Sequence, residues 1–368
     1  MDTAERRATA ALWSFPGVGP VTLREVRKHV GSLGELLHRP VSEWAPLVPW
    51  HGASFAHVMA AGTLAFAAER LEERCRAHGA RILFSGDPAF PWRLEDIPKA
   101  PALLFAFGPG AEGPARRRLA IVGTRRIDNA CFARAHAIAA EAARFGLCVV
   151  SGAAEGTDTA AHLGAIAAKG ETWAFMGSAL DELDSSPRRV AQQIIDKGGT
   201  VFSEFPPGFR ANKNSFTHRN RLISGASDAV LVFRAPLKSG ALHTAKAAVL
   251  QGRPVVVTPG DQWDPRCEGS NALLRDGVAQ VHVDLGDLLK AVGLDGSISP
   301  QTPIALDLSQ LSPRAAEVLA LLGQGSSDFE GLQGSLPAAS SGELSSALVE
   351  LEVFGAVVHK GGRRYEKR

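Results

Sequence analysis

The sequence predicts a mixed α/β protein: a doubly wound parallel sheet with a small helical domain before it and a winged helix after it. Short, continuous apolar runs alternate with amphipathic segments from residue 81 to about residue 292, which is typical of parallel strands covered by helices. Earlier residues repeat apolar side chains every three or four positions. A stretch rich in glycine, serine and proline precedes residue 304. We therefore expect a helical domain at 1–78, a sheet domain at 79–293, a linker at 294–303 and a winged helix at 304–368.

The first domain contains a glycine-rich turn between its first two expected helices. Apolar spacing places helices at 8–15, 21–30, 33–37 and 54–74. The turn is Gly17-Val18-Gly19. In SAM-like, helix-hairpin-helix modules, such a turn offers backbone N–H groups to a nucleic-acid phosphate. The alternative is a turn that needs glycine only for its backbone angles.

The apolar runs of the central domain predict a Rossmann-like sheet. The apolar runs lie at 119–123, 147–151, 172–177, 200–203, 229–233, 254–258 and 280–283. Expected helices lie at 131–145, 157–169, 188–197, 220–227, 244–250 and 269–275. In a doubly wound sheet, ligands bind beyond the carboxyl ends of the strands, so the segments after these runs are the place to look for a site.

Small and basic residues follow almost every expected strand. The segments include Gly123-Thr124-Arg125, Ser151-Gly152 and Ser239-Gly240, and after the fourth strand Lys213 to Arg221. Small residues let the backbone approach a ligand, and N–H groups at helix starts bind anions. The strand ends together therefore predict an extended anion site, too long for a single phosphate.

The segment after the fourth strand combines cations with an aromatic ring. Lys213, Arg219 and Arg221 surround Phe216. Cations that track a backbone while a ring stacks on a base are typical of sites for single-stranded nucleic acid. The alternative is a solvated surface loop with a buried phenylalanine.

Neither a cofactor nor a metal is predicted. The dinucleotide motif G-x-G-x-x-G and the P-loop motif G-x-x-x-x-G-K-[ST] are absent. The four cysteines lie far apart, without a C-x-x-C pair, so we expect buried thiols in a reducing compartment. A formal net charge of +2 excludes a globally basic nucleic-acid binder but allows a local basic site.

Six sequence blocks, in order, resemble the DNA processing protein A family, also called DprA or Smf. The blocks are G-T-R at 123–125, S-G-A-A-E-G-T-D-T-A-A-H at 151–162, E-F-P-P-G at 204–208, F-T-H-R-N-R-L-I-S at 216–224, S-G-A-L-H-T-A at 239–245 and G-S-N at 269–271. Departures from the family pattern are Asp184-Ser185, where a tyrosine-proline is frequent, and Thr217, where a proline is frequent.

The resemblance implies a cytoplasmic protein of bacterial natural transformation. Such proteins bind and protect incoming single-stranded DNA, help to load the recombinase RecA, and usually form homodimers. By motif match the strand-binding pocket falls on Arg125, Lys213 and Phe216. The residues expected around them are Gly123, Thr124, Ser151, Gly152, Arg219, Asn220, Ser239 and Gly240, and the basic segment adds Arg221.

Enzymatic alternatives receive less support from the residues. Ser151, Asp158 and His162 could be taken for a triad, but an acid near a helix start and a histidine bonded to a loop explain the last two structurally. A nucleoside-monophosphate phosphoribohydrolase-like enzyme is the second hypothesis. It needs paired carboxylates, for which Glu155 and Glu204 are the candidates. We expect no enzyme.

The pattern of helices and a hairpin in the last domain predicts a winged helix, and its charges predict an acidic face. Helices are expected at 313–322, 328–332 and 341–351, followed by a hairpin that turns at Gly361-Gly362. Residues 325–359 contain no lysine or arginine, although phosphate contacts supply most of the affinity for DNA. We therefore expect this domain to contact protein rather than to read DNA. No apolar run reaches the about 18 residues of a membrane span.

Overall fold

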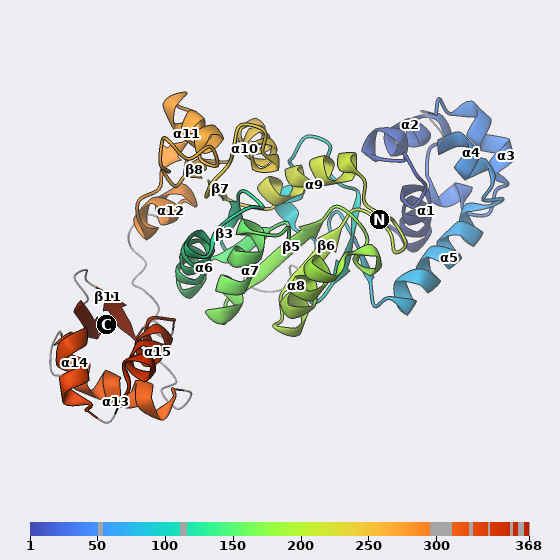
Figure 1. Cartoon of the computed structure of the whole chain (residues 1–368). Helices are drawn as coiled ribbons and strands as arrows, with labels where there is room; N and C mark the ends of the chain where they lie inside the picture. Colours follow the sequence, from blue (N-terminus) through green and yellow to red (C-terminus); the bar gives the residue numbers. More distant parts are fainter. Residues whose placement is uncertain are drawn as a thin grey trace. The chain divides into compact units, whose positions relative to one another are not determined.

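The chain divides into two compact units, Met1–Ser299 and Pro300–Arg368. A computed structural model describes residues 1–50, 54–110, 116–294, 311–323, 327–337, 339–353, 356–359 and 364–367 (Figure 1). Most of the expected linker, 295–303, lies outside these residues. We describe each unit by itself.

The first unit begins with helices, as predicted. They are α1 (Thr3–Trp13), α2 (Pro20–Val30), α3 (Val41–Trp44), α4 (Ser54–Met59) and α5 (Leu64–Ala77). The single helix expected at 54–74 is wrong, because Gly62 takes a φ of +72° and Thr63 caps α5 by accepting a hydrogen bond from the Phe66 N–H. The helices share one apolar core with Phe84, Leu103 and Phe105 of the adjoining strands.

A nine-stranded sheet forms the centre of this unit. Its strand order is β1-β2-β6-β5-β4-β3-β7-β8-β9. Seven strands are parallel and coincide with the seven predicted runs: β3 (Arg118–Val122), β4 (Cys148–Ser151), β5 (Thr172–Met176), β6 (Thr200–Ser203), β7 (Ala229–Val232), β8 (Val255–Val257) and β9 (Gln280–Val281). The doubly wound parallel sheet is confirmed.

Helices cover both faces of the parallel strands (Figure 1). The first face carries α6 (Asn129–Arg144), α7 (Thr157–Ala167), α8 (Ser185–Asp196) and α12 (Leu285–Ala291). The other face carries α9 (Lys213–Gly225), α10 (Gly240–Leu250) and α11 (Glu268–Arg275). This double cover explains why the strands are continuously apolar.

Two further strands extend the sheet beyond the prediction. β1 (Arg81–Phe84) and β2 (Leu103–Phe107) add antiparallel strands beside β6, so the sheet is mixed. Neither strand was among the predicted ones, because a long connection separates the two strands and local spacing does not indicate that they pair.

The basic segment after β6 is helical where a loop was expected. A helix was predicted at 220–227, but α9 already begins at Lys213. Asn212 caps it: its side chain accepts a hydrogen bond from the Ser215 N–H, and the Ser215 hydroxyl accepts one from the Asn212 N–H. Phe216 and Arg219 therefore project from the first two turns of a helix.

The second unit contains three helices and a small antiparallel sheet. The helices are α13 (Pro313–Leu322), α14 (Phe329–Ser335) and α15 (Ser341–Val353), close to the predicted positions. The strands β10 (Ser327–Asp328), β11 (Val357–His359) and β12 (Arg364–Lys367) pair in the order β10-β12-β11. The expected turn at Gly361-Gly362 lies outside the described residues. Across the described parts of the chain, no helix has the length and apolarity to cross a membrane.

Candidate functional site

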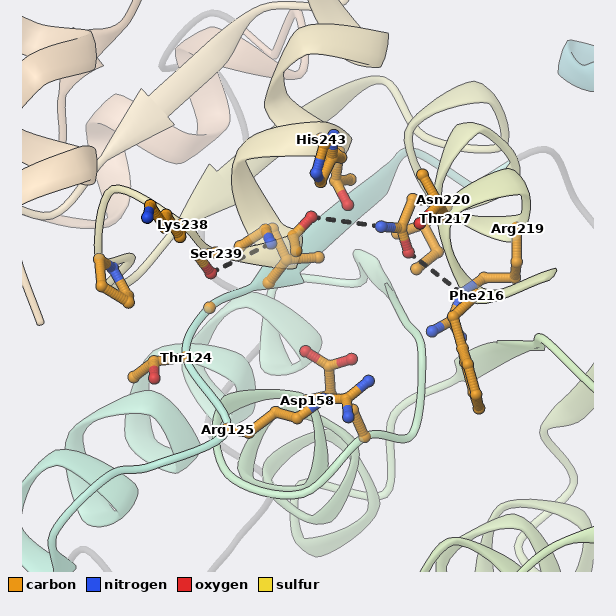
Figure 2. A pocket seen from close by; sticks show the side chains of 18 of the residues that line it. Thr124, Arg125, Asp158, Phe216, Thr217, Arg219, Asn220, Lys238, Ser239 and His243 are labelled. Atoms are coloured by element: carbon orange, nitrogen blue, oxygen red, sulfur yellow. Dashed lines mark hydrogen bonds between the residues drawn. The ribbon is translucent and has the colours of Figure 1, made fainter. Parts of the chain in front are cut away.

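A cavity of about 600 Å³ lies beyond the carboxyl ends of the parallel strands (Figure 2). Its walls come from the segments after β3 and β7 and from the starts of α9 and α10. Of the twelve predicted site residues, eight line it: Gly123, Thr124, Arg125, Phe216, Arg219, Asn220, Ser239 and Gly240. The structure therefore has a cavity at the edge of the sheet where the sequence predicted a site.

The segment after β3 is held tightly and presents two arginines. The Thr124 N–H donates to the Arg234 carbonyl at 2.7 Å, and the Thr157 hydroxyl donates to the Thr124 carbonyl at 3.1 Å. A Cβ on Gly123 would lie 2.6 Å from the Thr157 hydroxyl oxygen, so glycine permits this close approach. Arg125, which is exposed, is thus fixed at the cavity by its backbone.

Phe216 lies beside Arg125 at the cavity. The Arg125 guanidinium carbon is 5.7 Å from the centre of the half-buried ring, within the range of a cation–π contact. Behind the ring, a Cβ on Gly177 would lie 2.7 Å from the Phe216 Cδ1. Glycine at the end of β5 therefore sets the position of the ring.

Arg219 forms the floor of the cavity rather than an exposed contact. It is buried, and its Nη1 donates to the Gly152 carbonyl at 2.8 Å and also to the Phe175 carbonyl. A Cβ on Gly152 would lie 2.5 Å from the same Nη1. Burial lowers the pKa of Arg219 to about 10, opposed by nearby Asp158. The group thus stays charged at neutral pH and joins α9 to the ends of β4 and β5.

The residues of the supposed triad have structural partners. The Ser151 hydroxyl donates to the Ile121 carbonyl at 2.6 Å, beneath the cavity. The His162 Nδ1 and the Thr172 hydroxyl oxygen are 2.7 Å apart, and burial lowers the pKa of His162 to about 3. Asp158 lines the cavity, and burial raises its pKa against the attraction of Arg219.

Arg221 faces away from the cavity, which corrects its expected place in the site. Its Nη2 donates to Glu204 Oε1 at 2.6 Å, in a pair that is almost wholly buried. The Trp13 indole donates to the Glu204 carbonyl at 2.9 Å. A small hollow of about 100 Å³ here brings the predicted turn, Gly17-Val18-Gly19, against the segment after β6. Arg221 therefore belongs to the junction between the N-terminal helices and the sheet.

Eleven other described residues also line the cavity, and three of them carry exposed basic or imidazole side chains. These three are Arg126, Lys238 and His243. Arg126 directly follows Arg125, and Lys238 directly precedes Ser239, so the basic strand-end segments contained the signal for both. Among the described residues, the lining carries four lysine or arginine side chains and one carboxyl group, Asp158, which favours a polyanion.

One hydrogen bond joins α9 to α10 across the cavity, and a second caps the start of α10 (Figure 2). The Asn220 side-chain amide donates to the Gly240 carbonyl at 3.2 Å. The Ser239 hydroxyl caps α10 by accepting from the Ala241 N–H at 3.2 Å. Lys213 begins α9, but its side chain lies outside the described part of the structure.

The sequence profile of the family described as DNA recombination-mediator protein A matches residues 81–293, more than half of the chain. The chain belongs to this family. The match spans the sheet domain, including every segment that lines the cavity. The matched residues thus include all six sequence blocks, the strands of the sheet and the cavity lining.

Proteins from several bacteria are similar to this chain. Protein Smf of Synechocystis sp. is 28% identical over 97% of both chains. DNA processing protein DprA of Streptococcus pneumoniae is 35% identical over 53% of this chain and 68% of its own. An X-ray structure of the Streptococcus pneumoniae protein covers 78% of this chain and 98% of its own, with 25% identity and a TM-score of 0.65.

A second solved structure concerns DNA binding by a relative. It is DNA processing protein A from Helicobacter pylori, which gives insight into that protein's single-stranded DNA binding mode. It covers 58% of this chain and 95% of its own, with 28% identity and a TM-score of 0.52. The family is thus one of DNA recombination mediators rather than of enzymes.

Proposed function

We propose that this protein binds single-stranded DNA in the cavity beyond the sheet and acts in homologous recombination during natural transformation. In this proposal it works in the cytoplasm as a homodimer, protects incoming DNA and loads RecA onto it. Family membership supports recombination as the process, and the Helicobacter pylori relative supports the single strand as the ligand.

The observation that carries the proposal is the pairing of Arg125 with Phe216 at a cationic cavity. Single strands offer a charged backbone and unpaired bases together, and a site that combines cations with a ring meets both. Duplex DNA hides its bases from such a ring. One cavity carboxyl group also gives little support to glycosidic hydrolysis, which canonically uses two.

The residues of the proposed site have different roles. Arg125, Arg126 and Lys238 bind phosphates, and Phe216 stacks on a base. Gly123, Thr124, Asn220, Ser239 and Gly240 shape the walls, while Ser151, Gly152 and Arg219 support the floor from beneath. Lys213 joins the cations by its place in the family motif. Arg221 is left out, because Glu204 neutralises it.

We also propose identities for the flanking parts. Residues 1–78 form a SAM-like domain, 79–293 the Rossmann-like DNA-binding domain, 294–303 a linker and 304–368 a winged helix. The three helices and three-stranded sheet of the second unit support the last assignment. Because residues 325–359 lack lysine and arginine, this domain contacts protein partners in our proposal.

Fluorescence anisotropy with a labelled oligothymidylate and a blunt duplex of equal length tests the proposed ligand. We expect tight, salt-dependent binding of the single strand and much weaker binding of the duplex. Arg125→Ala should weaken binding and flatten the dependence on salt by about one phosphate contact. Equal affinity for both DNA forms would overturn the proposal.

The chain offers a matched control for Arg125. Arg70 lies over the exposed ring of Phe66 on α5, with the guanidinium carbon 5.8 Å from the ring centre, and neither residue lines the cavity. Arg70→Ala removes the same charge from a similar pair elsewhere. It should leave affinity and salt dependence unchanged.

A further inference from the structure

The segment between β8 and α11 exposes a tryptophan that the cavity does not include. Trp263 is 83% exposed, more than any other large apolar residue identified as exposed. In the described parts of the chain, no hydrogen bond, ion pair or ring contact engages its indole. The other five tryptophans are buried or have such a contact: Trp13, Trp44, Trp50, Trp92 and Trp173. An indole left wholly to water is costly and typical of an interface.

The backbone that carries Trp263 is well ordered. The Trp263 N–H donates to the Asp261 carboxylate at 2.8 Å, and the Cys267 N–H donates to the Asp264 carbonyl at 2.8 Å. At the start of the segment, the Asn271 side chain pairs with both the N–H and the carbonyl of Gly260, at 3.1 and 3.0 Å. A ring presented by such a segment loses little freedom on binding.

The same segment supports both walls of the cavity. The Arg234 Nη1 donates to Asp264 Oδ2 at 3.0 Å, and the Arg234 carbonyl accepts from the Thr124 N–H of the first wall. The other wall is packed against the start of α11, directly after this segment: a Cβ on Gly269 would lie 2.8 Å from the carbonyl of Pro236, which lines the cavity. Trp263 therefore protrudes from the segment that packs behind the walls of the proposed DNA site.

Two charged side chains of this segment, Asp264 and Arg266, have ionic partners. Arg266 donates to Asp264 Oδ1 at 2.9 Å and to Asp128 Oδ2 at 3.0 Å. Hydrogen bonds from Cys131 are the main reason why the pKa of Asp128 is lowered, with a smaller effect of Arg266, whereas hydrogen bonds from Arg266 lower the pKa of Asp264. Both carboxylates are therefore ionised. The Arg266–Asp128 hydrogen bond joins this segment to the start of α6, and Asp128 lies two residues after Arg126 in the chain. The segment thus adds a ring to the region where Arg125 and Arg126 line the cavity, and rings together with cations are typical of single-strand recognition.

We propose that Trp263 is a second stacking platform, which takes a base of single-stranded DNA where the strand leaves the cavity past Arg126. This inference rests on the proposed function, because the strand must first occupy the cavity. It extends the site across the segment between β8 and α11, beyond the residues matched by the family motifs.

Strand length separates the two platforms. We would measure the affinity of oligothymidylates of about 6 and about 20 nucleotides for the full-length protein and for Trp263→Ala. The variant should bind the longer strand about five- to 100-fold more weakly, with a much smaller loss for the shorter one. Trp263→Phe should restore most of the affinity. Trp92→Ala, which removes an exposed indole outside the cavity lining, is the matched control and should bind normally.

Tryptophan emission supplies an independent readout. The longer strand should quench emission from the wild type and from Trp92→Ala, and most of this quenching should vanish in Trp263→Phe. Suppose that the wild type binds, that Trp263→Ala binds each strand as tightly as the wild type does, and that quenching persists in Trp263→Phe. The inference then fails, while the proposed function stands. Unchanged DNA binding with an altered sedimentation coefficient would assign the ring to a protein contact and also overturn it. Failure of the wild type to bind either strand would overturn both.

Discussion

The guanidinium of Arg125 and the ring of Phe216 occupy the same part of the cavity but offer different interactions. A guanidinium attracts phosphate, with an energy that falls as salt rises. A ring stacks on a base, and this contribution depends little on salt. The two contributions can therefore be separated by experiment.

Phe216→Ala should weaken the binding of single-stranded DNA by about 1–3 kcal/mol through lost stacking. The slope of affinity against salt should stay as in the wild type, because no charge is removed. Anisotropy titrations at several salt concentrations measure both quantities. Phe66→Ala removes an exposed ring that has a similar contact with Arg70 outside the cavity, and it should have no effect. Wild-type affinity in Phe216→Ala would exclude the stacking role.

His162 should make the fold sensitive to acid. Its folded pKa of about 3 lies below the ordinary value of 6.5, because burial disfavours the imidazolium and Arg219 repels it. The unfolded chain therefore binds a proton that the folded chain does not, and this contribution to stability is lost as pH falls from about 6.5 towards 3. The raised pKa values of Asp158 and Glu204 act in the opposite direction.

A comparison with His162→Asn isolates that contribution. Urea unfolding between pH 4 and pH 7 should show a smaller loss of stability in acid for the variant than for the wild type. Parallel pH profiles of the two proteins would contradict the assignment to His162.

Helix α9 brings cavity residues and junction residues together. Phe216, Arg219 and Asn220 are three and four positions apart and so share one face, which borders the cavity. Arg221 follows directly and points to Glu204 instead. The same helix therefore lines the cavity and contacts the junction with the N-terminal helices.

Gly152→Ala should loosen the attachment of α9 to the sheet. The added Cβ would lie 2.5 Å from the Arg219 Nη1, so the guanidinium must move from its carbonyl partners. We expect a loss of about 1–3 kcal/mol in the free energy of unfolding, measured in urea. Gly240→Ala is the control, because a Cβ there meets nothing within 4 Å. Equal stability of the two variants would show that Arg219 has room to adjust.

Glu204→Ala should destabilise the junction. It leaves Arg221 buried without its counter-charge, and breaking a buried pair costs about 3–5 kcal/mol. The double variant Glu204→Ala, Arg221→Leu removes both charges and should recover part of this loss. A double-mutant cycle in urea measures the coupling, and additive losses would mean that the pair contributes nothing specific.

The two units of the molecule differ in charge and should differ in function. A chain ending at Ser299 keeps the first unit, with the sheet and the cavity. It should bind single-stranded DNA nearly as well as the full chain, because residues 325–359 of the second unit carry no cation for phosphate. Anisotropy on the truncated and full chains tests this. Complete loss of binding would place part of the DNA site in the second unit.

Most of the central sheet could be predicted, and part of the site could not. Strand runs and strand-end glycines are local signals, so β3 to β9 and the cavity edge follow from the sequence. The edge strands β1 and β2 pair across a long connection, which local spacing does not reveal. Trp263 belongs to no periodic pattern, and its exposure became evident only in the folded chain.

Residue types and their spacing were enough to predict the parallel sheet, the family and the edge of the sheet where the cavity lies, because hydrophobic period and strand-end residues are encoded locally. The partner of each cation required the tertiary structure. Arg125, Arg219 and Arg221 are alike in sequence, yet the first is exposed at the cavity, the second bonds carbonyls beneath it, and the third is paired with Glu204. Packing between distant segments decides which charge remains available, since burial and pairing arise only when those segments meet.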